Sequence, residues 1–145
     1  MNGRLDDVRV RRVGDAGILI ELASVIDPVV NARAVGVADA IRASAIPGVR
    51  DVVPTYRSVA VHVDPLSVDQ ITLDAAIRDA LEAATDIHVG RRHEVPVVYG
   101  GADGPDLDTL AASLGLSPAQ LVGLHTDRDY RVYMLGFLPG FAYMG

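Results

Sequence analysis

The sequence contains no cysteine and no lysine, and each absence excludes a class of chemistry. Without cysteine there are no thiolate nucleophiles, no disulfides and none of the usual structural zinc sites. Without lysine there is no Schiff-base chemistry and no phosphate-binding lysine of a Walker A loop, because arginine keeps its proton near neutral pH. Backbone amides, arginine, carboxylates and histidine remain as the tools for any chemistry.

Long hydrophobic runs and an excess of positive charge are also missing. Half of the 145 residues are apolar, but no apolar run approaches the roughly 20 residues that span a bilayer. The formal net charge of −6 repels polyanions, so we do not expect nucleic acid as a partner. The N-terminal stretch MNGRLDDVRV has two aspartates that balance its two arginines, and it lacks the apolar segment of a secretory leader. These features predict a globular chain in the cytoplasm with no membrane partner.

The strand signals of the first 90 residues come in two pairs. Alternating valines at 8–13 and the apolar run at 18–23 flank a short glycine-containing connection, which predicts a hairpin. Residues 49–54 and 56–64 carry two further strand patterns, the second with valines on one face. We therefore expect an antiparallel sheet.

Two helices are predicted in the same region. Asp27 and the proline that follows it suit the start of a helix that ends before Pro47. Apolar residues spaced by four predict a second helix, for which Ser67 or Thr72 could be the cap. The order of strands and helices, ββαββα, predicts an α+β fold over residues 1–90, an antiparallel sheet with helices on one face.

A second region is expected over residues 91–145. The apolar segment 94–100 predicts a strand, and the residues from 106 to 114 predict a short helix. Ser117 and Gln120 have the spacing of a capping box, which predicts a helix that runs to about residue 125. A strand is expected from Tyr130 to Leu135.

Glycine-rich loops, aspartates and histidines each offer a weak signal for a ligand. The glycines at 14–17 lie between two strands, and those at 100–104 lie in an acidic loop, so turns are favoured over nucleotide sites. Aspartates 103, 106 and 108 fit helix capping better than a cation site. The four histidines include no pair with metal-ligand spacing. We expect no metal site.

His125 is the histidine whose position suggests chemistry. It closes a predicted helix and lies just before an aromatic strand. A neutral imidazole there could act as a general acid or base, whereas a cation at a helix C-terminus is an equally good structural explanation. Both interpretations stay open from the sequence.

Five of the seven aromatic residues lie in the last sixteen positions, around the segment GFLPGFAYMG. Its glycines and proline argue against a regular helix or strand, yet its aromatics are too apolar for a solvent loop. Core packing, a ligand site and a partner interface all remain possible roles. The candidate site or interface residues are Gly136, Phe137, Pro139, Gly140, Phe141 and Tyr143.

Several motifs in order resemble one known family. The elements YGG-x-DGPDL, LH and GF-x-PGFAY, together with VGDAGILIE and PGVRDVVPTYRSVAVHVDP, are similar to the family that includes the B subunit of prokaryotic 5-oxoprolinase, the kinase inhibitor KipI and allophanate hydrolase subunit 1. The resemblance implies an N-terminal α+β domain over 1–90 and a cyclophilin-like β-barrel domain that begins at 91–145. Family members continue beyond the last motif, so we expect the barrel to be incomplete here.

The resemblance also implies an activity and partners. In this family the A, B and C subunits act together to hydrolyse 5-oxoproline to glutamate, and ATP is used by the whole hetero-oligomer rather than bound by a motif in this chain. The aromatic segment would then form a wall of the substrate site or of the subunit interface. Amides of Gly136 and Gly140 could stabilise an oxyanion, and His125 would transfer a proton. The alternative is an inhibitor of a sensor histidine kinase, as in the KipI branch, without catalysis of its own.

Overall fold

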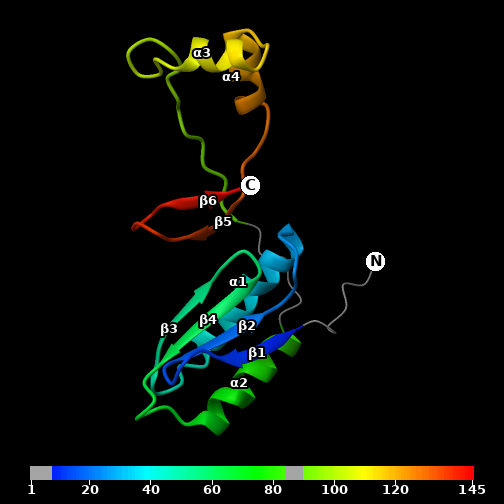
Figure 1. The fold of residues 1–145 in the computed structure, drawn as a ribbon. Coiled ribbons are helices and arrows are strands. Elements are labelled where there is room, and N and C mark those ends of the chain that lie inside the picture. The colour runs from blue at the N-terminus through cyan, green and yellow to red at the C-terminus, as the bar shows by residue number, and fades with distance from the viewer. Residues whose placement is uncertain (1–7, 84–89) are drawn as a thin grey trace. The chain divides into compact units, whose positions relative to one another are not determined.

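The computed structural model describes residues 8–83 and 90–145, which form two compact units (Figure 1). One unit combines the first 90 residues with 132–145, and the other contains 91–131. Residues 132–145 group with the first unit because they contact it; the domain boundaries 1–90 and 91–145 stay a prediction. His88 lies outside the described residues.

A four-stranded antiparallel sheet forms the first unit, with the strands in the order β1-β2-β4-β3. The strands are β1 (Arg9–Arg12), β2 (Gly17–Glu21), β3 (Val49–Pro54) and β4 (Ser58–Val63). All four were predicted within a few residues. One face of the sheet is apolar because side chains alternate along each strand, and its buried members include Ile18, Ile20, Val59 and Val61.

Two helices cover that apolar face, α1 (Pro28–Ala43) and α2 (Gln70–Ala83). Buried residues of both helices join the sheet in one hydrophobic core, and the helices also contact each other. The predicted α+β architecture, an antiparallel sheet with helices on one face, is confirmed. No helix among the described residues is long and apolar enough to cross a membrane.

Asp27 begins α1 as the sequence predicts. Its carboxylate accepts hydrogen bonds from Val29 N at 2.7 Å and Val30 N at 3.3 Å, while its backbone is extended. These bonds satisfy two amides that have no partner inside the helix.

Replacing Asp27 with alanine is expected to lower the free energy of unfolding by about 0.5–2 kcal/mol, because two helix amides lose their acceptor. Urea unfolding followed by circular dichroism measures the change. Asp27→Asn is the matched control, since asparagine also caps, and should retain most of the stability. Equal losses in the two variants would contradict the capping role.

The start of α2 differs from the prediction. Asp69, and neither Ser67 nor Thr72, accepts bonds from the amides of the first turn, Ile71 N and Thr72 N, each at 3.3 Å. The Thr72 hydroxyl also donates to Asp69. This hydroxyl, with the two amides, holds the pKa of Asp69 below its usual value against a smaller effect of burial. Carboxylates compete better than hydroxyls for helix amides because they carry charge.

An ion pair joins the start of β3 to the end of β4. Arg50 Nη2 lies 2.9 Å from Asp64 Oδ2, and Asp64 Oδ1 accepts a bond from Leu66 N at 3.1 Å. The bond from Arg50, followed by that from Leu66, lowers the pKa of Asp64. A lowered pKa means that the contribution of Asp64 to stability is present at neutral pH and is lost as the pH falls through the folded-state pKa.

The unit 91–131 contains two short helices, α3 (Leu107–Ser113) and α4 (Pro118–Thr126). The capping box that begins α4 is confirmed, since Ser117 Oγ accepts from Gln120 N and the Gln120 side chain accepts from Ser117 N. Asp106 precedes α3 but makes no capping bond with its side chain, so the expected cap is wrong there. Its backbone is already helical and does not aim the carboxylate at the first turn.

The predicted strand at 94–100 does not form. No described residue pairs with this segment, and Val95 and Val98 are 76% and 72% exposed. Strands need a neighbouring ladder as well as an apolar pattern. The pattern alone therefore misassigned this segment.

The C-terminal residues form a two-stranded hairpin of β5 (Val132–Leu135) and β6 (Ala142–Met144). The first strand matches the prediction, but a strand at 142–144 was not expected among so many glycines. Both glycines that precede β6 lie in the loop, which leaves three residues free to pair with β5. No closed barrel forms within the described residues.

Candidate functional site

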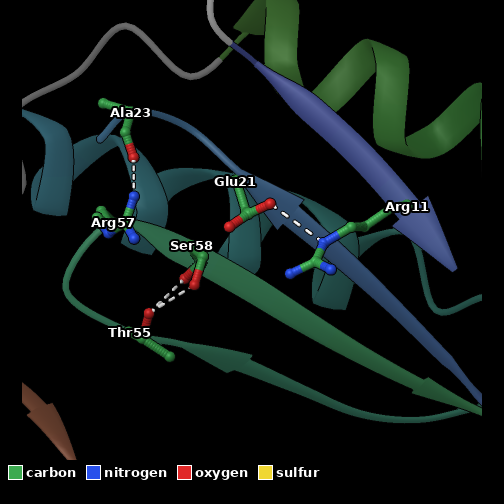
Figure 2. A network of polar contacts seen from close by, with 6 residues as sticks. All are labelled: Arg11, Glu21, Ala23, Thr55, Arg57 and Ser58. Carbon is green, nitrogen blue, oxygen red and sulfur yellow. Dashed lines mark hydrogen bonds and ion pairs between the residues drawn. The ribbon is translucent and has the colours of Figure 1, made fainter. Parts of the chain in front are cut away.

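The turn between β3 and β4 is held by its own side chains (Figure 2). Thr55 Oγ1 lies 2.8 Å from Ser58 Oγ and donates to Ser58 O, while Thr55 N donates to the same carbonyl. Arg57 Nη1 donates to Ala23 O at 2.6 Å, which ties the turn to the segment after β2. These bonds fix the backbone from which the ring of Tyr56 projects.

Asn31 connects this turn to the C-terminal hairpin. It lies on the buried side of α1 with only 1% of its surface exposed. Its Nδ2 donates to Thr55 O and to Tyr133 O, each at 3.0 Å. One buried amide group therefore satisfies carbonyls of two segments that are distant in the sequence.

Five aromatic rings, which we call the aromatic cluster, continue from this connection along the hairpin. Tyr56 stacks on Tyr133 with centroids 5.1 Å apart and meets Tyr143 edge-on at 6.4 Å. Phe141 contacts Tyr143 at 5.2 Å and Phe137 at 6.4 Å. Such edge-on contacts add to the stabilisation from burial alone. The cluster thus leads from the sheet to the tip of the hairpin.

Exposure increases along the aromatic cluster. The three tyrosines are half-buried, whereas Phe141 is 50% and Phe137 is 86% exposed. The half-buried tyrosines thus contribute to packing, and the site or interface role predicted for the loop residues, Tyr143 included, stays a prediction. An exposed ring held in place is typical of a recognition surface.

The loop between the strands consists of two tight turns. Leu138 N donates to Gly136 O at 2.7 Å across Phe137, whose φ is +60°. In the second turn, Phe141 N donates to Leu138 O at 3.0 Å. The two residues between them are Pro139 and Gly140, and Gly140 has φ +80°. This second turn has the Pro-Gly sequence that a type II turn requires. Phe137 is the strained position, since a non-glycine residue rarely adopts a positive φ.

The two loop amides differ in availability. Gly136 N donates to Phe141 O at 3.1 Å, so it is already engaged and the expectation of an oxyanion donor there is not met in this structure. Gly140 N makes no hydrogen bond with the described residues. Beside the hairpin, a groove of about 380 Å³ runs between β3 and β5, and its lining includes Arg42, Pro54 and Tyr133. Its volume suits a small ligand.

Replacing Phe137 with glycine is expected to yield a protein more stable than Phe137→Ala by about 1 kcal/mol, because only glycine adopts the positive φ without strain. Both substitutions remove the same exposed ring, so their difference isolates the backbone. Chemical unfolding of the two variants measures it. Equal stabilities, or a more stable alanine variant, would show that the turn relaxes and stores no strain.

His125 lies in the last turn of α4, in the other unit, and contacts two tyrosines. Its Nδ1 shares a hydrogen bond with the Tyr99 hydroxyl, and the rings meet edge-on at 5.7 Å. Tyr130 OH donates to the backbone carbonyl of His125 at 3.0 Å. The imidazole is exposed, and its Nε2 makes no hydrogen bond with the described residues. Tyr99 therefore holds the ring while Nε2 faces solvent, a geometry that permits proton transfer.

The structure assigns the predicted site residues to both units. His125 belongs to the unit 91–131, and the six loop residues belong to the hairpin grouped with the sheet. Their common role stays a prediction. Within the described residues, no group of three or more histidine, aspartate or glutamate side chains is placed to hold a metal ion. The loop at 100–104 precedes a helix of only seven residues and is lined by acidic side chains.

Two residues of this region were missed by sequence reasoning, Tyr56 and Asn31. Asn31 shares the helix face of Ala34 and Ala38, both fully buried, so a polar residue at that position signals a specific partner. Tyr56 lies between two predicted strands, and nothing in its own segment indicates contact with the distant hairpin.

Curated relatives are similar along most of the chain. A protein named as the B subunit of 5-oxoprolinase, from Bacillus subtilis (strain 168), is 34% identical over an alignment of 150 positions, which includes 94% of this chain and 62% of the relative. A protein of the same name from Escherichia coli O157:H7 is 40% identical over 108 residues, 69% of this chain and 46% of the relative. The chain thus spans about half to two thirds of the length of these relatives.

A solved structure and a family match agree with these relatives. The crystal structure of TTHA0988 is 32% identical, with a TM-score of 0.76 over 94% of this chain and 26% of the longer chain. The family described as carboxyltransferase domain, subdomain C and D, matches residues 8–145, which include the sheet, the aromatic cluster and His125. The chain therefore belongs to the carboxyltransferase subdomain C and D family.

Proposed function

We propose that this chain is the B-type component of an ATP-dependent hetero-oligomer that hydrolyses 5-oxoproline, or a related small amide, to the open-chain acid. The observation that carries the proposal is the 34% identity with a 5-oxoprolinase B subunit over 94% of the chain. A homologue of the C subunit is the proposed partner, and the A subunit would complete the assembly. The same proposal places the complex in the cytoplasm.

The hairpin supports a role at the substrate site or at the subunit interface. Phe137 and Phe141 are exposed on a loop that two tight turns and the aromatic cluster hold in shape. Rings in this position would exclude water from a reaction centre completed by a partner subunit. Arg42 on the adjacent groove is already paired with Asp39 at 2.9 Å and donates to Val52 O, so the proposal assigns it no role in binding the substrate.

His125 is the proposed proton-transfer group. Opening a lactam ring adds water across the C–N bond, so the carbonyl carbon gains an oxygen and the ring nitrogen gains a proton. The exposed Nε2 can take a proton from water or deliver one to the nitrogen, while the Tyr99 hydroxyl restrains the ring through Nδ1.

The described residues offer no phosphate site of the usual kind for ATP. The chain has no lysine, and its glycine-rich loops either join two strands or precede the seven-residue helix α3 beside acidic side chains. A helix N-terminus with several free amides and a cation is the usual phosphate site. We therefore place ATP on one of the partner subunits, with none of its chemistry assigned to the residues described here.

Reconstitution tests the proposal. The chain is co-expressed with homologues of the A and C subunits, and glutamate released from 5-oxoproline is measured with and without ATP. We expect ATP-dependent release by the full assembly and none when this chain is omitted. Release at the same rate without the chain, or no release by a correctly folded assembly, would overturn the assignment. The inhibitor alternative stays a prediction, which unchanged autophosphorylation of a histidine kinase at saturating protein would exclude.

A further inference from the structure

The outer edge of β1 and the neighbouring helix α2 form a second surface, remote in sequence from the hairpin. A groove of about 410 Å³ lies between them. Buried or partly buried apolar residues form its base, namely Ile18, Ile77 and Leu81. We call this surface the β1–α2 groove. It does not involve the aromatic cluster or His125, so it requires an explanation of its own.

At Val10 and Arg12, the backbone of β1 presents groups beside this groove that no described residue pairs with. Val13 N donates to Gly17 O at 2.8 Å, so residues 13 and 17 form a hydrogen-bonded pair of the antiparallel ladder. Such pairs alternate along the strands, so the N–H and C=O groups of Val10 and Arg12 point away from β2. β1 is an edge of the sheet, and no described residue pairs with its outer side.

The same two residues direct their side chains into the groove. Val10 and Arg12 line it, and Val10 is 51% exposed. A strand added to this edge would pair with both residues, and every second side chain of that strand would enter the groove. Peptides that extend a sheet combine backbone bonds for affinity with side-chain pockets for specificity.

The charge of the groove indicates the chemistry of its occupant. Arg12 and Arg78 line it together with a single carboxylate, that of Asp74. Arg12 also donates to Gln70, and Arg11, which lines the groove too, is paired with Glu21 at 3.2 Å and is not counted here. Arg78 makes no hydrogen bond or ion pair with the described residues. A basic groove is unexpected on a chain with a net charge of −6. Guanidinium groups bind carboxylates through paired hydrogen bonds, which favours an acidic ligand.

A second copy of the chain does not fit this edge. Pairing two β1 strands would bring the arginines at positions 9, 11 and 12 of both copies together. Like charges opposite one another destabilise a sheet. The occupant must therefore differ from this chain in charge.

We propose that the β1–α2 groove binds an extended acidic segment of a partner protein, which pairs with Val10 and Arg12 and adds a fifth strand to the sheet. Its carboxylates meet Arg12 and Arg78, and its apolar side chains pack on Ile77. Because β1 has four residues, the paired part of the segment spans about four to five residues.

The test uses the full chain and a synthetic hexapeptide, blocked at both ends, with glutamate at its first and fifth positions, valine at its third and threonine between them, so that two carboxylates and one apolar side chain share a face. Titration followed by amide NMR is expected to show saturable shifts and slower hydrogen exchange at Val10 and Arg12, with affinity that falls as salt is raised. The same hexapeptide with lysine in place of both glutamates is the matched control and should not bind. Binding of both peptides, or of neither, would overturn the proposal and leave the arginines as protection against edge association.

Variants locate the binding on the groove. Val10→Pro removes only an outward N–H, which an edge strand tolerates, and should abolish peptide binding with the β1–β2 ladder intact. Arg78 lies on α2, outside the β1–β2 ladder. Arg78→Glu should weaken peptide binding by about tenfold or more, and it tests the groove even if Val10→Pro fails to fold. Arg128→Glu changes the net charge equally but lies in the other unit, and should leave affinity within about twofold. Equal effects of the two charge reversals would contradict a specific groove.

Discussion

Replacing His125 with glutamine is expected to lower kcat for glutamate release by the reconstituted assembly by about 100- to 10,000-fold, the usual contribution of a positioned acid or base. Glutamine keeps the size and polarity of the side chain but cannot exchange a proton in this way. KM for 5-oxoproline should change little, because the substitution removes a group that acts in the transition state.

Two further variants make the His125 prediction specific. Tyr99→Phe removes the hydroxyl bonded to Nδ1 and should lower kcat by a smaller factor, because the imidazole remains but loses its restraint. His62→Gln alters an exposed histidine of β4 and serves as the matched control. The proton-transfer role fails if His125→Gln and His62→Gln have equal kcat in assemblies of the same composition.

Replacing Asn31 with alanine is expected to lower the free energy of unfolding by about 1–3 kcal/mol, because the buried carbonyls of Thr55 and Tyr133 lose a donor. The substitution should also disturb the hairpin, because Tyr133 lies on β5. Without this donor the contact of Tyr56 with Tyr133 loses its support, so the near-ultraviolet circular dichroism of the tyrosines should decrease at native conditions. Denaturant unfolding measures the loss of stability, and the near-ultraviolet spectra of the variant and of the unsubstituted chain measure the change at the tyrosines.

Asn31→Asp sharpens the same prediction through its pH dependence. The introduced carboxylate would place oxygen against two carbonyl oxygens in a buried site, which raises its pKa in the folded state. Stability should therefore be lowest above that raised pKa and should recover as the pH falls toward the unfolded-state value, since the protonated form donates a hydrogen bond. A stability loss that is the same at acidic and neutral pH would contradict the buried donor role.

Local signals in the sequence predicted the sheet unit well. The alternation of valines indicated the four strands, and Asp27 indicated the start of α1, because both depend on near neighbours in the chain. Asp69 shows the limit of this reasoning. Residues 67, 69 and 72 can all cap a helix, and the sequence pattern did not show that the charged carboxylate of Asp69 accepts from the first-turn amides. The segment 94–100 failed for a different reason, because a strand depends on a partner elsewhere.

The sequence predicted which residues form the candidate site, but it did not predict the long-range contacts that hold them. The composition of the last sixteen residues marked the aromatic loop, and the position of His125 after a capped helix marked a histidine with possible chemistry. The roles of Asn31 and Tyr56 depend on contacts with Tyr133, which lies far from both in the chain. The local pattern marks Asn31 as a polar residue on a buried helix face, but it does not identify the distant partner.

Hydrogen–deuterium exchange of this chain within the assembled complex, with and without 5-oxoproline, tests the central claim most directly. If the chain contributes to the hydrolytic site, the amides of residues 136–141 should exchange more slowly when the substrate is bound, and the Phe137→Ala assembly should lose that protection. Unchanged exchange throughout this chain, with protection confined to the partner subunits, would contradict a role for the chain at the site.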